Sequence, residues 1–196
     1  MRRINEIFYS LQGEGANTGV PAVFVRFSGC NLRCAFCDTQ HESGTMMSDE
    51  EIVAEVCRYP QARILVLTGG EPSLHIDAAL VAKLKRATGK IITIETNGTR
   101  LLPEGIDWVT LSPKMGFEGG DLQPVVLDEC DELKVVYRGQ RLDGYFGIRA
   151  KEYFLQPCYC DDEEERIANM RATIEAVMSD SRWRLSLQTH RIVGIT

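Results

Sequence analysis

The sequence has 196 residues, 44% of them hydrophobic, which is enough for one substantial core, and no stretch resembles a linker, so we expect a single domain over residues 1–196. Its formal net charge of −6 argues against a nucleic acid as partner, because phosphate binding requires clustered Lys and Arg. The sequence has no signal-peptide core and no run of about 18 apolar residues, so we expect a cytoplasmic protein without a membrane segment. In a reducing compartment the seven cysteines favour metal or redox chemistry over disulfides.

The first predicted strand covers the apolar run 23–27, and a C-x3-C-x2-C motif follows it. The motif consists of Cys30, Cys34 and Cys37. A [4Fe–4S] cluster ordinarily takes four cysteines, so a loop that offers three leaves one iron open for a cofactor. The alternative is a zinc knuckle, for which His41 is the nearby candidate for a fourth ligand.

Ser48 and Glu51 form the S-x-x-E signature of a capping box and predict the start of a helix. The apolar face of this helix consists of Ile52, Val53 and Val56. The next apolar run, 64–67, predicts a buried strand that ends at Thr68-Gly69-Gly70-Glu71-Pro72. Its paired glycines allow the backbone to approach a ligand closely, or they simply end the strand in a turn.

A second helix is expected to begin near Ile76 and to end at Gly89, because glycine is a common helix terminator. The strand predicted at 91–95 ends in Glu95-Thr96-Asn97-Gly98-Thr99, where Asn-Gly by itself would indicate only a tight turn. The strand at 108–111 ends in Ser112-Pro113-Lys114, whose hydroxyl and ammonium groups can bond a ribose or a carboxylate.

Two further strands are predicted at 133–136 and 153–156. The second is followed by Pro157-Cys158-Tyr159-Cys160, a C-x-C segment that can hold a second metal, form a redox pair or be purely structural. An acidic run then begins a helix that we expect over 161–177, and a last strand is predicted at 183–187.

Alternating strands and helices are typical of an α/β fold with a parallel sheet and right-handed crossovers. A full barrel of eight strands takes about 250 residues. The shorter chain, with roughly seven predicted strands, therefore predicts a shortened, open barrel of the TIM type with fewer helices than a full barrel. The active site is expected at the carboxyl ends of the strands, where the polar motifs lie.

The cysteine spacing, with Phe36 directly before the last cysteine, resembles the radical S-adenosylmethionine superfamily. Gly69-Gly70-Glu71-Pro72 resembles the superfamily segment that meets the methionine amino group. The resemblance implies that S-adenosylmethionine chelates the open iron of a [4Fe–4S] cluster and is cleaved to a 5′-deoxyadenosyl radical. Delegation to a cofactor makes chemical sense, because side-chain acids and bases cannot abstract hydrogen from an unactivated carbon.

A closer resemblance extends from residue 7 to residue 190, nearly the whole chain. The motifs that carry it are IFYSLQGEG (7–15), PAVFVRFSGC (21–30), CDT (37–39), ETNGT (95–99), LSPK (111–114), ELKVV (132–136), LQP (155–157) and LQTH (187–190). Together they resemble the 7-carboxy-7-deazaguanine synthase family. The resemblance implies a radical, magnesium-dependent ring contraction of 6-carboxy-5,6,7,8-tetrahydropterin to 7-carboxy-7-deazaguanine with loss of ammonia, on the path to 7-deazapurines such as queuosine.

The family's functional residues can be carried over by position, and no catalytic side chain is implied because the radical comes from the cofactor. The metal ligands would be Cys30, Cys34 and Cys37 for the [4Fe–4S] cluster and Thr39 for Mg²⁺. The S-adenosylmethionine contacts would be Phe36, Cys37, Asp38, Gly70, Glu71, Thr96, Asn97, Ser112, Pro113, Lys114, Gln156, Pro157, Cys158 and Tyr159. The pterin contacts would be Leu11, Gln12, Gly13, Glu14, Arg26, Thr68, Gln188, His190 and Thr196.

The resemblance also implies a homodimer and an electron donor such as a flavodoxin or ferredoxin. Two other functions stay open on the sequence. An activase for a glycyl-radical enzyme would share the cysteine loop but act on a protein, and the pterin-like N-terminal motif disfavours it. A non-catalytic iron–sulfur or zinc module would not need the motifs at 69–72 and 111–114.

Overall fold

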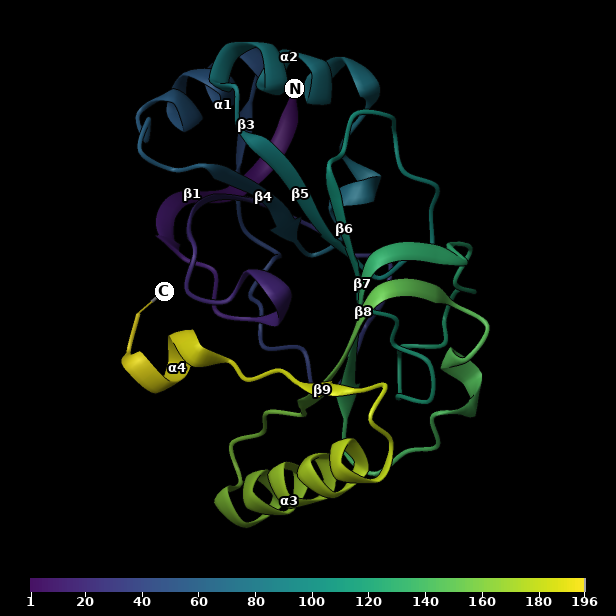
Figure 1. Ribbon diagram of the computed structural model, residues 1–196. Coiled ribbons are helices and arrows are strands. Elements are labelled where there is room, and N and C mark those ends of the chain that lie inside the picture. The colour runs from purple at the N-terminus through teal and green to yellow at the C-terminus, as the bar shows by residue number, and fades with distance from the viewer. Residues whose placement is uncertain (196) are drawn as a thin grey trace.

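The structure is a computed structural model that describes residues 1–195. Its strands form one mixed sheet in the order β3-β1-β2-β4-β5-β6-β7-β8-β9 (Figure 1). The strands are β1 (Arg2–Leu11), β2 (Pro21–Phe27), β3 (Thr45–Met47), β4 (Ile64–Gly69), β5 (Ile91–Thr96), β6 (Trp108–Leu111), β7 (Glu129–Tyr137), β8 (Arg149–Pro157) and β9 (Arg184–Leu185). The helices are α1 (Asp49–Cys57), α2 (Ala78–Thr88), α3 (Glu163–Ser179) and α4 (Thr189–Val193), with short 3₁₀ turns η1 (Gly15–Asn17), η2 (Pro72–Leu74) and η3 (Asp143–Tyr145).

Seven strands of the described chain, β2 and β4 to β9, run parallel to one another, and all of them were predicted. The sheet does not close, because β3 and β9 are its two edges. Strands β1 and β3 were not predicted and add to the β2 edge in antiparallel pairing. The predicted α/β fold, a shortened and open barrel, is therefore confirmed.

Helices α1, α2 and α3 follow the predicted signals. Ser48 accepts a hydrogen bond from the backbone N–H of Glu51, whose side chain accepts one from the backbone of Ser48, so the capping box of α1 is complete. Helix α2 ends at Gly89, which adopts a left-handed φ of 64°. No α-helix lies between β5 and β8 in residues 1–195, which confirms the expectation of fewer helices than in a full barrel.

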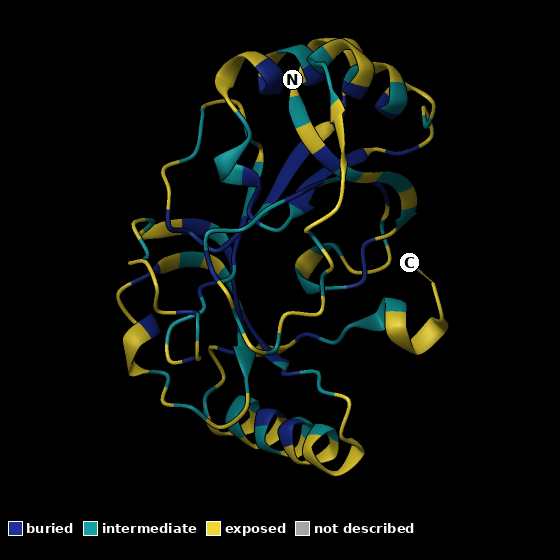
Figure 2. Ribbon diagram, turned by 180° about the vertical axis from the view of Figure 1, so that it is seen from behind, coloured by how far each residue is buried: buried dark blue, intermediate teal, exposed yellow. Residues whose placement is uncertain are grey.

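Alternation along the strands gives the sheet an apolar face and a second, partly polar face. Val23, Val25 and Phe27 of β2 pack under α1 and α2 in the larger core. Ala22 and Phe24 point the other way and form a small apolar layer with residues of β4. Figure 2 shows the buried residues concentrated in the central strands, while the outer surfaces of the helices are exposed. The polar residues of the second face lie beyond this small layer, toward the carboxyl ends of the strands.

The C-terminal segment, residues 186–195, leaves the β9 edge and crosses back to the loop that follows β1 (Figure 1). The backbone N–H of Gly15 donates to Ser186 Oγ at 3.0 Å, and the N–H of Thr189 donates to the Gly13 carbonyl at 2.9 Å. The segment thereby bridges the open side of the sheet. None of the helices in residues 1–195 has the length and apolar character needed to cross a membrane.

Candidate active site

The cysteine loop, residues 30–37, follows β2 and is shaped by its own backbone. The N–H of Cys37 donates to the Cys34 carbonyl at 3.1 Å, which closes a turn, and the N–H of Leu32 donates to Cys30 Sγ at 3.4 Å. Leu32 is buried, so it fixes the middle of the loop to the protein. These contacts turn the thiol groups toward a single cavity.

Two glycines let neighbouring loops approach the cysteine loop closely. A Cβ on Gly70 would overlap the carbonyl oxygen of Gly29, and one on Gly119 would overlap the carbonyl oxygen of Arg33. The N–H of Arg33 donates to the Gly119 carbonyl at 3.2 Å. Gly70, directly after β4, is thus needed for close packing against the start of the cysteine loop.

Phe36 ties the end of the loop to the rest of the site. Its ring centroid lies 4.4 Å from that of Phe117, a buried residue of the loop after β6. The Arg138 guanidinium lies over the other ring at 4.9 Å. This aromatic contact explains why an aromatic side chain before Cys37 suits the loop.

The three thiols of the loop are the donor atoms available to a cluster. Burial raises the pKa of Cys30, and the nearby thiols of Cys34 and Cys37 add to this effect. All three are free of disulfides, and of the cysteines in residues 1–195 they alone line the cavity. In the same part of the chain no three His, Cys, Asp or Glu side chains converge on a point that would hold a single metal ion. Three thiols without a fourth are the donor set that a [4Fe–4S] cluster with one open iron requires.

Glu71 joins the ends of β4 and β5 beneath the cysteine loop. The residue is only 1% exposed. Its carboxylate accepts hydrogen bonds from Thr96 Oγ1 at 2.7 Å, from the Asn97 N–H at 2.7 Å and from the Ser73 N–H at 3.0 Å. Asn97 Nδ2 in turn donates to Asn31 Oδ1 at 3.0 Å, so this network reaches into the cysteine loop.

A second polar network lies on the same face of the sheet, further from the cysteines. Glu95 of β5 accepts hydrogen bonds from Gln12 Nε2 at 3.0 Å and from Thr68 Oγ1 at 2.9 Å. Lys134 of β7 donates to Glu14 Oε2 and lies 3.8 Å from Glu95 Oε1. The loop after β1 is thereby held against the strands.

Lys134 determines which side chains of this second network are ionised. Burial opposes ionisation of Glu14, but the Lys134 ammonium outweighs it and lowers the pKa of that carboxyl to about 2. Burial likewise opposes the charge on Lys134, yet the carboxylates of Glu14, Glu95 and Glu132 hold its pKa above the usual value. Glu14 and Lys134 are therefore both ionised at neutral pH.

The C-terminal segment connects the second network to the cysteine loop. Gln188 Nε2 donates to Glu14 Oε1 at 2.9 Å and to Asp38 Oδ2 at 3.1 Å. Arg191 also pairs with Asp38, at 2.8 Å, and its guanidinium lies 3.9 Å from the ring centroid of Tyr159. One segment thus contacts both ends of the cavity.

One cavity of about 1550 Å³ collects most of the predicted site residues. Those that line it are Leu11, Gln12, Gly13, Glu14, Arg26, Cys30, Cys34, Phe36, Cys37, Asp38, Thr39, Thr68, Gly70, Glu71, Thr96, Asn97, Ser112, Lys114, Gln156, Pro157, Tyr159, Gln188 and His190. Pro113 and Cys158 do not line it, and Cys158 is buried. Thr196 lies outside the described residues.

Three residues of the site were not assigned from the sequence: Glu95, Lys134 and Arg191. Two of them carried a signal. A lysine inside the apolar strand Leu133-Lys134-Val135-Val136 is unusual enough to suggest a buried partner. Glu95 is likewise a charged residue inside a largely buried strand. Arg191 lies in the short helix α4, which no pattern in the sequence predicted.

Comparison with known proteins agrees with this geometry. The family model "Radical SAM superfamily" matches residues 24–130, which contain the cysteine loop, Gly69 and Gly70, and the ends of β5 and β6. The match therefore covers more than half of the chain, including the first network described above.

Similar proteins cover the whole chain. A curated relative from Bacteroides thetaiotaomicron, named 7-carboxy-7-deazaguanine synthase, is 57% identical over 195 residues, covering 100% of this chain and 99% of its own. The crystal structure of QueE from Escherichia coli is similar with a TM-score of 0.76 at 31% identity, covering 95% of this chain and 93% of that one. Streptococcus suis SuiB bound to S-adenosylmethionine shares only the fold, with a TM-score of 0.55 at 17% identity over 81% of this chain and 44% of that one.

Proposed function

Because this chain belongs to the 7-carboxy-7-deazaguanine synthase family of the radical S-adenosylmethionine superfamily, we propose that it contracts the ring of 6-carboxy-5,6,7,8-tetrahydropterin to give 7-carboxy-7-deazaguanine and ammonia. Its cofactors are the [4Fe–4S] cluster, S-adenosylmethionine and Mg²⁺, as in the family. The observation that carries the proposal is that the cysteine loop and the Glu14–Lys134 network line one cavity. A cofactor held at one end can then meet a small polar substrate at the other.

The cysteine end of the cavity holds the cofactors in this proposal. Cys30, Cys34 and Cys37 ligate the cluster, which with S-adenosylmethionine supplies a radical for hydrogen abstraction. Gly70 offers its backbone at the cavity wall, where Glu71 has ordered the adjoining strand ends. The protein's contribution is to place and orient these groups and to limit access of water.

Two further groups suit S-adenosylmethionine by their chemistry. Lys114 is half-buried, and its ammonium donates to Ser112 Oγ at 2.8 Å and to the Ser112 carbonyl at 2.6 Å. Burial lowers the pKa of this lysine, although the nearby Cys34 counteracts that effect. Lys114 can direct a remaining N–H toward a carboxylate or a ribose, since an ammonium has three donors. The cavity that Ser112 and Lys114 line is also lined by Phe36, Asp38, Gln156 and Tyr159.

The other end of the cavity holds the pterin. Arg26, whose Nε donates to Glu6 at 2.8 Å, lines the wall and offers a planar fork to the substrate carboxylate. Gln12, Thr68 and His190 supply further polar groups. Thr39 carries a hydroxyl oxygen that suits Mg²⁺, a hard cation that keeps several other oxygen ligands. Pairing each polar edge of the pterin allows rejection of analogues that lack those groups.

The oligomeric state, the domain organisation, the electron donor and the cellular compartment are further parts of the proposal. We expect a homodimer, supported by the exposed apolar side chains of Met178 on α3 and of Ile192 and Val193 on α4. We expect one domain over residues 1–196, since a single sheet carries both networks. A flavodoxin or ferredoxin would supply electrons, and the free state of the cysteines suits the reducing cytoplasm.

The test is a turnover assay on protein reconstituted without oxygen, with S-adenosylmethionine, reductant, Mg²⁺ and 6-carboxy-5,6,7,8-tetrahydropterin. We expect 7-carboxy-7-deazaguanine to form. Formation of 5′-deoxyadenosine without conversion of the pterin would favour another radical enzyme, such as a glycyl-radical activase. Absence of both products from a loaded protein would favour a non-catalytic module.

A further inference from the structure

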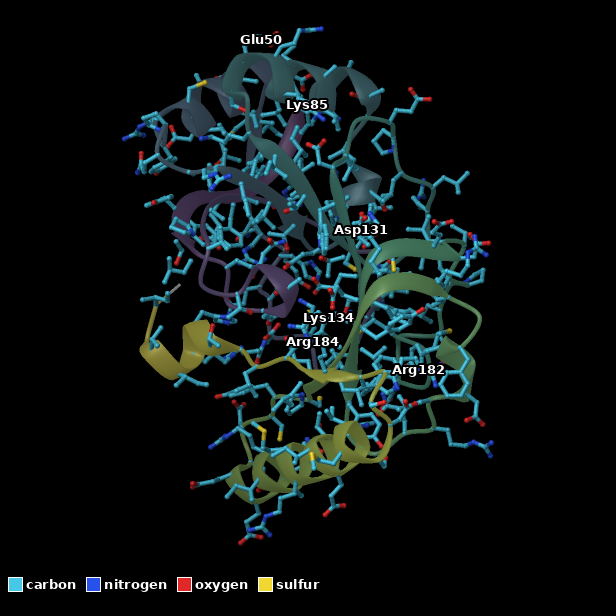
Figure 3. The ribbon with its side chains drawn as sticks, viewed as in Figure 1. Glu50, Lys85, Asp131, Lys134, Arg182 and Arg184 are labelled. Carbon is cyan, nitrogen blue, oxygen red and sulfur yellow. The ribbon has the colours of Figure 1, made fainter. Side chains whose placement is uncertain are left out.

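Lys134 is a buried cation on the face of the sheet that lines the cavity. Its side chain is 5% exposed and lies in the middle of the molecule, between β7 and the C-terminal segment (Figure 3). A buried ammonium is costly unless it is paired, so its presence inside a central strand requires an explanation. No role in the reaction follows for it from the cofactor or from the substrate contacts named above.

Three carboxylates surround this ammonium. Glu14 accepts its hydrogen bond, Glu95 Oε1 lies 3.8 Å away, and Glu132 acts on it electrostatically. Glu132, two residues before Lys134 on β7, does not line the cavity and accepts a hydrogen bond from the Ala16 N–H at 3.0 Å. Glu14 and Glu95 line the cavity together with the lysine. On the side where a substrate would lie, Lys134, Glu14 and Glu95 therefore present more hydrogen-bond acceptors than donors.

The carboxylate oxygens of Glu14 and Glu95 can accept further hydrogen bonds from a ligand in the cavity. Each Glu95 oxygen accepts one hydrogen bond, Oε1 from Gln12 and Oε2 from Thr68. Each Glu14 oxygen also accepts one, Oε2 from Lys134 and Oε1 from Gln188. A carboxylate has about four lone-pair sites, so each oxygen can accept one more hydrogen bond. Such acceptors suit a ligand edge rich in N–H groups, as the reduced pterin ring is.

We propose that Lys134 is a positioning residue of the pterin site, which keeps Glu14 and Glu95 ionised and oriented so that they accept hydrogen bonds from the N–H groups of the substrate ring. This inference rests on the proposed function and names a residue that acts through two carboxylates. Without the ammonium, Glu14 would lie buried beside Glu95 and Glu132, and repulsion between like charges would favour its protonation. A protonated Glu14 becomes a donor and no longer complements an N–H.

The experiment is a double-mutant cycle on the reconstituted holoenzyme, comparing wild type, Lys134→Met, Glu14→Gln and the double variant. Affinity for 6-carboxy-5,6,7,8-tetrahydropterin is measured by calorimetry without reductant. We expect Lys134→Met to weaken affinity on the order of tenfold or more, and to weaken it by a clearly smaller factor in the Glu14→Gln background, where only its effect through Glu95 is left. In steady state KM rises by a larger factor than kcat falls.

The pH dependence of affinity gives an independent readout. The charged groups around Glu14 are Lys134 and Glu132 on β7, Glu95 on β5, His190 on α4 and Lys114 after β6. All of them except Lys134 are unchanged in Lys134→Met. We expect wild-type affinity to vary little between about pH 8 and about pH 6, and that of Lys134→Met to fall over this range as Glu14 takes up a proton.

Controls separate this role from stability and from the cofactor site. Lys151 lies at an exposed position on β8 and pairs with Asp131 at 2.6 Å. Lys151→Met removes this lysine–carboxylate pair and should leave the affinity for the pterin unchanged. Iron content should be the same in every variant, and Lys151→Met should also form 5′-deoxyadenosine without pterin at the wild-type rate. If Lys134→Met does not fold, Lys134→Gln keeps a donor for Glu14 without the charge and is compared in the same cycle.

Two results would overturn the inference: unchanged pterin affinity in folded Lys134→Met or Lys134→Gln, or an equal factor of loss with and without Glu14→Gln. Failure of the proposed function looks different, since the wild-type holoenzyme itself would then not bind the pterin. The two ideas therefore fail by distinct observations.

Discussion

Glu71 lies at the point where two loops of the cofactor site meet. Its carboxylate accepts three hydrogen bonds that hold the residues after β4 and β5 together. Because Asn97 continues this network to Asn31 in the cysteine loop, a single buried carboxylate orders several walls of the cavity.

Replacement of Glu71 by Gln should destabilise the protein by about 1–3 kcal/mol, because the new amide N–H₂ would face a backbone N–H that has lost its acceptor. S-adenosylmethionine affinity should fall as well, since the strand ends move. Urea unfolding and equilibrium binding measure the two effects. Glu104→Gln, at an exposed position between β5 and β6, is the control. Unchanged stability and binding in Glu71→Gln would contradict the ordering role.

Thr39 is half-buried at the cavity wall, directly after the cysteine loop and Asp38. Thr39→Ala should keep the iron content and weaken magnesium-dependent turnover, because only one oxygen ligand of a hard cation is removed. Activity is measured as a function of Mg²⁺ concentration, with iron analysis as the control. A magnesium dependence identical to that of the wild type would remove Thr39 from the site.

At the scale of elements, the signals that worked were strong and local. Strands β2, β4 and β5 are buried on both faces or nearly so, and such strands give continuous apolar runs. Strand β1 is mostly half-buried or exposed, and its sequence mixes polar and apolar residues without such a run. Strand β3 has only three residues. Tertiary pairing determines both of them, β1 with β2 and β3 with β1, so the sequence pattern alone could not predict them.

Helix α1 shows the value of a specific cap. Ser48→Ala removes the side chain that accepts from the Glu51 N–H at 3.2 Å and should cost about 1 kcal/mol of unfolding free energy. Denaturant unfolding measures the loss. Since α1 packs with α2 on the apolar face, turnover and iron content should stay at wild-type values. A loss of activity in folded Ser48→Ala would show that this helix is coupled to the site.

For the molecule as a whole, buried charge makes stability depend on pH. The Glu14 carboxyl has a pKa lowered to about 2, whereas an ordinary Glu in the unfolded chain titrates near 4.5. A lowered folded-state pKa stabilises the protein above the unfolded value, and that stabilisation is lost as pH falls from about 5 toward about 2. Glu14→Gln should therefore show a flatter acid limb in a plot of unfolding free energy against pH. Identical acid limbs would contradict the pairing with Lys134.

The whole site also shows where sequence reasoning reached its limit. Motifs placed at strand ends could be assigned, because the carboxyl ends of parallel strands meet at one edge. Cys158 was assigned by position, but the backbone turns its side chain into the protein, where Asn169 donates to its carbonyl at 3.0 Å. Lys134 and Arg191 act across the cavity on Glu14 and Asp38, and such long-range pairs are not visible in a linear pattern.

The central claim is that Cys30, Cys34 and Cys37 hold a cluster with one iron free to bind S-adenosylmethionine. Electron paramagnetic resonance of the reduced, anaerobically reconstituted protein, before and after addition of S-adenosylmethionine, tests it most directly. The account predicts a [4Fe–4S] signal that changes on addition and is absent from Cys34→Ala. A signal that S-adenosylmethionine leaves unaltered would mean that every iron is already enclosed by protein ligands, and the account would be wrong.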